Sequence, residues 1–91
     1  MTSKRVVFSG RVQGVGFRYT TKQLALGFEV VGSVKNLKDG TVELLVMGEN
    51  GEVVEFIEEI TGESELAGLI KEHTVWEIDP LTNARGFRIS D

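Results

Sequence analysis

The sequence has no cysteine, only one histidine (His73) and only one proline (Pro80). Without cysteine the chain can form no disulfide, no zinc site built from thiolates and no cysteine nucleophile. A single histidine also excludes a metal site with several histidine ligands. The chain has no apolar run near the roughly 20 residues of a membrane-spanning helix, and no apolar signal segment follows its first residues. These absences favour a cytoplasmic protein that has no membrane partner.

Charge is unevenly distributed along the chain. Residues 1–40 contain seven Lys or Arg and two acidic residues, whereas residues 41–91 contain three and twelve. The overall net charge of −4 argues against nonspecific binding to nucleic acid, so we expect no nucleic-acid partner. A basic N-terminal half within an acidic protein favours a local field for a small anion, although clustered charges also form ordinary solvated faces.

Length and composition predict one folded domain, residues 1–91. Apolar residues make up 41% of the chain, which is enough for a single core. Alternating apolar residues indicate strands, and apolar residues at i, i+3, i+4 and i+7 indicate helices. Residues 62–71 fit either a loop or an irregular helix. The remaining elements are expected as a strand at about 4–12, a helix at 17–27, a strand ending at Asn36, a strand at 41–47, a helix at about 50–61, a strand at 73–78 and a short strand at 86–89.

The order of these elements is that of the ferredoxin-like, split βαβ class of α+β folds. We expect an antiparallel sheet with spatial order 4-1-3-2, a short fifth strand, and two helices on one face. Asp39-Gly40 marks a hairpin turn between the second and third strands. A right-handed crossover makes the first two strands parallel, so their C-terminal ends share one end of the sheet. The loop Gly10–Gly16 and Asn36 are therefore predicted to lie close together.

The loop Gly10–Gly16 has the features of an anion-binding loop. Its glycines at positions 10, 14 and 16 permit backbone conformations in which successive N–H groups point inward. The helix that follows adds unpaired N–H groups and the positive end of its dipole. Arg18 lies in the first helical turn, where a cation is unfavourable unless an anion is bound. A phosphate group held by the guanidinium fork would resolve this conflict.

The residues alone leave two interpretations of this loop open. Either it cradles an anion, or it is a tight turn from which Arg18 points to solvent. Asn36 is equally ambiguous, because asparagine is common at the start of a turn. The loop is neither the ATP-binding P-loop nor the dinucleotide fingerprint. It has no Gly-Lys-Ser/Thr sequence, and Gly14-Val15-Gly16 is not followed by the third glycine.

The segment Gly10-Arg11-Val12-Gln13-Gly14-Val15-Gly16-Phe17-Arg18 resembles the first signature of the acylphosphatase family at every position. Gly32–Asn36, with Gly40, Val42 and Gly48 at the family's spacing beyond it, resembles the second signature, and Gly86–Ile89 also fits. The resemblance spans essentially the whole chain. It implies a ferredoxin-like α/β sandwich that hydrolyses the carboxyl–phosphate bond of acyl phosphates without a metal or a cofactor.

The resemblance also implies roles for particular residues. Arg18 matches the family's phosphate-binding arginine, and Asn36 matches its water-orienting asparagine. The loop backbone would complete the phosphate site through Val12, Gln13, Gly14, Val15, Gly16, Phe17 and Arg18. The implied partners are an acyl phosphate as substrate and inorganic phosphate as product and inhibitor, and the expected state is a monomer. Ser33 stands where the family usually has an aromatic residue. The strand pattern places Ser33 on the face opposite Val34, so the change should affect packing or substrate fit more than the catalytic pair.

Two other functions are alternatives. One is a non-catalytic, anion-binding or regulatory module with the same fold, but the presence of both Arg18 and Asn36 favours an enzyme. The other is a ferredoxin-like RNA-binding domain, which needs exposed aromatic residues on its central strands. The strand expected at 41–47 has no aromatic residue, so this alternative ranks last.

Overall fold

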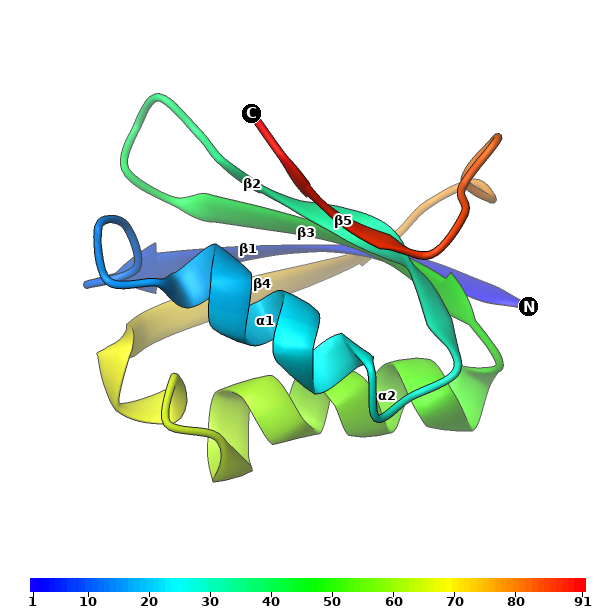
Figure 1. Ribbon diagram of the computed structural model, residues 1–91, viewed down its shortest axis with the longest axis horizontal. Coiled ribbons are helices and arrows are strands. Elements are labelled where there is room, and N and C mark those ends of the chain that lie inside the picture. Colours follow the sequence, from blue (N-terminus) through cyan, green and yellow to red (C-terminus); the bar gives the residue numbers. More distant parts are fainter.

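A computed structural model describes the whole chain, residues 1–91, as a sheet with two helices against it (Figure 1). The irregular region after the second helix is a π-helical segment, Glu59–Glu63, followed by a short 3-10 helix, Ala67–Leu69. Residues 62–71 are thus partly helical. The regular elements are β1 (Thr2–Gly10), α1 (Phe17–Ala25), β2 (Val30–Asn36), β3 (Val42–Gly48), α2 (Asn50–Glu58), β4 (Ile70–Glu77) and β5 (Phe87–Ser90).

The five strands form one sheet in the order β4-β1-β3-β2-β5. The first four pair antiparallel in the predicted order 4-1-3-2, which confirms the α+β ferredoxin-like fold. The fifth strand pairs parallel to β2, with Gly32 opposite Phe87, so the complete sheet is mixed. Phe87 is buried, and its ring meets that of Phe56 from α2 edge-on at 5.8 Å between centroids. This contact anchors β5 at the edge of the sheet.

Both helices cover the same face of the sheet, as predicted (Figure 1). Side chains of a strand alternate between the two faces, so Val6 and Phe8 of β1 and every second residue of β3 enter the core. Apolar side chains of α1 and α2 close the core from the other side. None of the helices combines the length and the hydropathy that a membrane-spanning helix needs. The fully buried large side chains are Val6, Phe8, Val12, Phe17, Val34, Val42, Leu44, Val46, Val53, Phe56, Ile60 and Leu66.

The ends of several elements differ from the prediction. α2 ends at Glu58, before the predicted 61, because the π-helical segment begins at Glu59. β1 stops at Gly10 and not at residue 12, because the register shifts between Ser9 and Gly10 and the Arg11 N–H donates to Leu69 O at 2.9 Å. Val12 therefore lies outside the sheet, although it is buried and continues the alternation. β4 begins at Ile70, not at residue 73, because it keeps pairing with β1 as far as Gly10. α1 ends two residues before the predicted 27.

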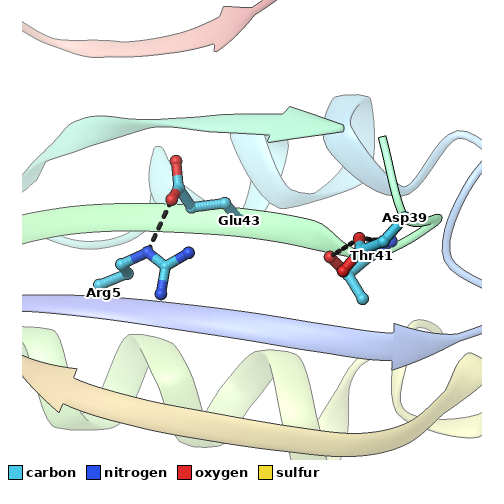
Figure 2. A network of polar contacts seen from close by, with 4 residues as sticks. All are labelled: Arg5, Asp39, Thr41 and Glu43. Atoms are coloured by element: carbon cyan, nitrogen blue, oxygen red, sulfur yellow. Dashed lines mark hydrogen bonds and ion pairs between the residues drawn. The ribbon is translucent and has the colours of Figure 1, made fainter. Parts of the chain in front are cut away.

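The hairpin between β2 and β3 is the turn that Asp39-Gly40 predicts. The Asp39 carboxylate accepts hydrogen bonds from the Thr41 hydroxyl at 2.6 Å and from the Thr41 N–H at 3.0 Å (Figure 2). These two bonds lower the pKa of Asp39 below its usual value, and the bond from the Thr41 hydroxyl has the larger effect. Leu37 N–H closes the turn by donating to Thr41 O at 2.9 Å. The turn thus fixes the end of β2, where Asn36 lies.

The face of the sheet away from the helices carries polar and charged side chains together with apolar ones such as Leu45 and Trp76. Arg5 donates through Nε to the Glu43 carboxylate at 2.7 Å, in the one ion pair of the chain (Figure 2). The same guanidinium lies over the ring of Trp76 at 4.9 Å from its centroid. Ser33 also lies on this face, opposite Leu45 in the register, whereas its neighbour Val34 is fully buried on the helix side. Ser33, which stands where the family usually has an aromatic residue, therefore lies on the opposite face of the sheet from the core and the helices.

Candidate active site

The loop between β1 and α1 folds into the conformation that its glycines allow. Gly14 and Gly16 both have left-handed backbone angles, with φ of 75° and 76°. Such angles are nearly free of strain only in glycine. Such angles allow successive N–H groups to face a common concave side, the arrangement known as an anion-binding nest. Gly16 is also the N-cap residue of α1, so the loop leads directly into the start of the helix.

The main-chain N–H groups of this segment are free to bind a ligand. From residue 12 to residue 19, none of them donates to an acceptor of the protein; the next N–H group, that of Thr20, makes the first helical bond, to Gly16 O at 3.0 Å. The first turn has no acidic residue and no side-chain cap. The positive end of the helix dipole is therefore not compensated by the protein itself.

Arg18 places a guanidinium at this positive end. Its Nη1 donates to Ser90 O, the backbone carbonyl near the end of β5, at 3.1 Å. No carboxylate lies within ion-pair distance of Arg18, since the only ion pair joins Arg5 to Glu43. The Ser90 bond orients the side chain without neutralising its charge. The guanidinium keeps further N–H groups for an anion with which it can form two parallel bonds.

Asn36 lies at the C-terminal end of β2 and lines the same cavity as Arg18. Its Oδ1 atom is buried and has no hydrogen-bond partner in the protein. A buried acceptor without a donor costs free energy of about 1–3 kcal/mol, so such atoms are rare in folded proteins. A donor from a bound molecule would satisfy it. The predicted proximity of the Gly10–Gly16 loop to Asn36 is found, because β1 and β2 end on the same side of the sheet.

Gln13 has a role in the structure that the sequence did not suggest. Its Nε2 atom donates to Leu37 O at 2.8 Å and to Thr41 O at 2.9 Å, both in the β2–β3 hairpin. The side chain therefore points away from the loop's N–H groups and ties the loop to the hairpin that follows Asn36. This tie holds the two halves of the candidate site in fixed relation.

The cavity formed by these elements has a volume of about 190 Å³. Of the residues predicted for the site, Gln13 and Val15 do not line it, so any part they take comes from their main-chain N–H groups. Tyr19 and Ile89 line it although they were not predicted. Arg18 supplies the only charge in the lining, so the field there favours an anion. The lining residues are Val12, Gly14, Gly16, Phe17, Arg18, Tyr19, Asn36 and Ile89.

A larger hollow of about 560 Å³ lies beside α2 and the π-helical segment. Four glutamates and one apolar residue, Phe28, contribute to its lining, so it repels phosphate and carboxylate groups. No three His, Cys, Asp or Glu side chains of the chain are grouped so that they could hold a metal ion, there or elsewhere. The larger hollow is therefore unsuited to an anion, whereas the cavity of about 190 Å³ combines Arg18 with main-chain N–H groups that have no protein acceptor.

Three comparisons with known proteins find relatives of this chain. The family model named Acylphosphatase matches residues 4–89. The chain is 39% identical to an acylphosphatase of Thermoplasma volcanium, over 98% of this chain and 97% of that protein. The crystal structure of acylphosphatase from Bacillus subtilis superimposes with a TM-score of 0.89 at 34% identity, covering 100% of both chains. The structure of T. kodakarensis HypF matches at 30% identity and a TM-score of 0.85, covering 100% of this chain but 12% of that one.

The fold and the cavity define a class of protein: a ferredoxin-like α+β domain whose first loop and helix line a cavity with one positive charge. The family match over nearly the whole chain, together with full-length relatives, specifies it further. The chain belongs to the acylphosphatase family, and it is an enzyme that hydrolyses acyl phosphates.

Proposed function

We propose that the phosphoryl group of an acyl phosphate binds between the main-chain N–H groups of residues 12–18 and the guanidinium of Arg18. The observation that carries this proposal is the convergence of unpaired N–H groups and an unpaired cation on one cavity. Fixed donors of this kind stabilise the charge on the phosphoryl oxygens in the transition state and need not reorganise during the reaction. Catalysis of phosphoryl transfer consists mainly of such positioning and charge stabilisation.

Asn36 is proposed to orient the attacking water. The Asn36 side chain lines the cavity, and its buried Oδ1 has no donor within the protein. The amide oxygen can accept a hydrogen bond from water, and the Nδ2 group of the same side chain can donate one to phosphate. An acceptor beside the anion donors favours an enzyme over a non-catalytic anion-binding module, which would need only donors. The RNA-binding alternative gains no support, because β3, the central strand, has no aromatic residue.

The reaction would proceed by in-line displacement. The oxygen of the oriented water forms a bond to phosphorus while the bond from phosphorus to the acyl oxygen breaks. The leaving group is a carboxylate, which departs without protonation. The cavity lining contains no carboxylate and no imidazole that could act as a general base. The proton of the water therefore passes to an oxygen of the phosphoryl group, and the products are the carboxylate and inorganic phosphate.

The proposed mechanism uses neither a metal nor a cofactor, and it needs one chain only. Its support is the chemistry of the lining, which offers a cation and amides where a metal-dependent phosphatase would offer carboxylates or imidazoles. We also propose that the enzyme acts as a monomer with a single domain. Inorganic phosphate, the product, presents the same oxygens to the same donors and should therefore compete with the substrate.

We predict that the purified protein hydrolyses benzoyl phosphate and acetyl phosphate. The rate with each substrate should be the same in the presence and in the absence of excess EDTA. An ordinary phosphate monoester should be hydrolysed far more slowly, because an alkoxide is a much poorer leaving group than a carboxylate. Release of inorganic phosphate from each compound, measured side by side, checks both statements. Loss of activity on chelation, restored by adding a divalent metal, would contradict the metal-free mechanism.

A further inference from the structure

Two exposed apolar side chains lie at the mouth of the active-site cavity. Tyr19, on α1, has 63% of its surface exposed, and Ile89, on β5, has 40%. Both belong to the cavity lining. Large apolar side chains are exposed at only seven positions of this chain, so two of the seven line one small cavity. Neither residue has a part in the phosphoryl chemistry, and apolar surface gathered at a binding cavity indicates contact with a ligand.

The direction of the reaction places the acyl group near these two side chains. The role proposed for Asn36 places the attacking water beside its buried amide oxygen, on the side of the cavity away from the exposed Tyr19 and Ile89. In-line displacement requires the leaving group on the side of phosphorus opposite this water. The leaving carboxylate must therefore point outward, toward the exposed Tyr19 and Ile89.

The size of the cavity leads to the same placement. Its volume is about 190 Å³. A phosphoryl group and an attacking water, which itself occupies about 30 Å³ in the liquid, take up a large share of such a space. The space that remains is limited, so an extended acyl group reaches the mouth. There it meets the ring of Tyr19 and the aliphatic side chain of Ile89, and the lining offers no second cation for a charged acyl group.

The geometry points to Tyr19 and Ile89 as the residues that bind the acyl group. They would give this enzyme a preference for acyl phosphates whose acyl part is extended and apolar, aromatic ones above all, over acetyl phosphate or acyl phosphates that bear a further carboxylate. This inference rests on the proposed orientation of the phosphoryl group. Binding energy gained at such a remote part of the substrate holds the reacting group in place and raises kcat/KM.

The test compares kcat/KM for benzoyl phosphate and acetyl phosphate in Tyr19→Ala, Ile89→Ala and Tyr19→Phe. The two substrates also differ in intrinsic reactivity. The quantity to compare between variant and wild type is therefore the ratio of kcat/KM for benzoyl phosphate to kcat/KM for acetyl phosphate. We expect the ratio to fall about fivefold to tenfold in Tyr19→Ala, in line with the loss of a few carbon atoms from an apolar contact, and less in Ile89→Ala. Tyr19→Phe keeps the ring and should keep the ratio. The inhibition constant of inorganic phosphate, which has no acyl group, should change by less than about twofold.

Leu26→Ala is the matched control, because Leu26 is an exposed apolar residue at the other end of α1 and lies outside the cavity. It should leave the ratio unchanged. An unchanged ratio in Tyr19→Ala, or an equal fall for both substrates, would overturn the assignment of the acyl site while leaving the proposed function intact. A wild-type protein that hydrolyses neither acyl phosphate would instead refute the proposed function itself.

Discussion

Arg18→Lys should reduce kcat/KM for acyl phosphates by about a thousandfold, a loss typical of an arginine that stabilises phosphoryl-transfer charge. Lysine keeps the positive charge but lacks the planar fork that grips two phosphoryl oxygens. Its single ammonium group also cannot do two things at once: donate to the Ser90 carbonyl, as Arg18 does, and hold the phosphoryl group with the same geometry. Steady-state kinetics with benzoyl phosphate, alongside far-UV circular dichroism, measure the effect and check that the fold is retained.

Arg11→Lys provides a matched control for this prediction. Arg11 lies in the same loop and is exposed, and its side chain does not line the cavity. The same chemical change there should alter kcat/KM by less than about twofold, as expected for an exposed side chain that makes no special contact. Near-normal activity of Arg18→Lys, or equal losses in the two variants, would refute the role assigned to the Arg18 guanidinium.

Asn36→Ala should lower kcat by about a hundredfold, because a reacting group that is no longer held in line costs roughly this factor. The inhibition constant of inorganic phosphate should change much less, since the donors that hold phosphate lie in the loop and on Arg18. Stability should be retained, because the Asn36 Oδ1 atom forms no hydrogen bond within the protein. Kinetics, phosphate inhibition and thermal unfolding separate these effects.

The opposite pattern would assign Asn36 differently. If Asn36→Ala weakens phosphate binding strongly while kcat at saturating substrate is unchanged, the amide is a binding group and not a water-orienting one. If the variant instead unfolds at a much lower temperature, Asn36 supports the β2–β3 hairpin. Thr41→Ala serves as the comparison for that case, because Thr41 bonds to Asp39 within the same hairpin and does not line the cavity.

Much of the fold followed from the sequence because its signals are local and agree with one another. The Asp39-Gly40 turn, the spacing of apolar residues in the helices and the order of elements together define the split βαβ topology. That topology then places Asn36 beside the loop before Arg18, with no need for side-chain detail. The position of β5 did not follow, because a strand of four residues does not specify its neighbour; burial of Phe87 against Phe56 does.

The parts of the site that sequence reasoning missed are those that depend on tertiary contacts. In the sequence, Gln13 is one of several loop residues expected to contribute only a main-chain N–H group. In the structure its side chain donates to the carbonyls of Leu37 and Thr41. Tyr19 and Ile89 are 70 residues apart in sequence and meet at the cavity only because α1 packs beside β5. Residue patterns indicate which side chains are buried, whereas the mouth of a cavity consists of exposed ones.

The most direct test of the central claim is a titration of the 15N-labelled protein with inorganic phosphate, followed by amide chemical shifts. The largest changes are predicted for the main-chain amides of residues 12–19, whose N–H groups have no protein acceptor, with a dissociation constant that matches the competitive inhibition constant. Phosphate binding that leaves these amides unshifted, and moves those around Arg85 and Arg88 instead, would contradict the claim that this loop and helix form the phosphoryl site.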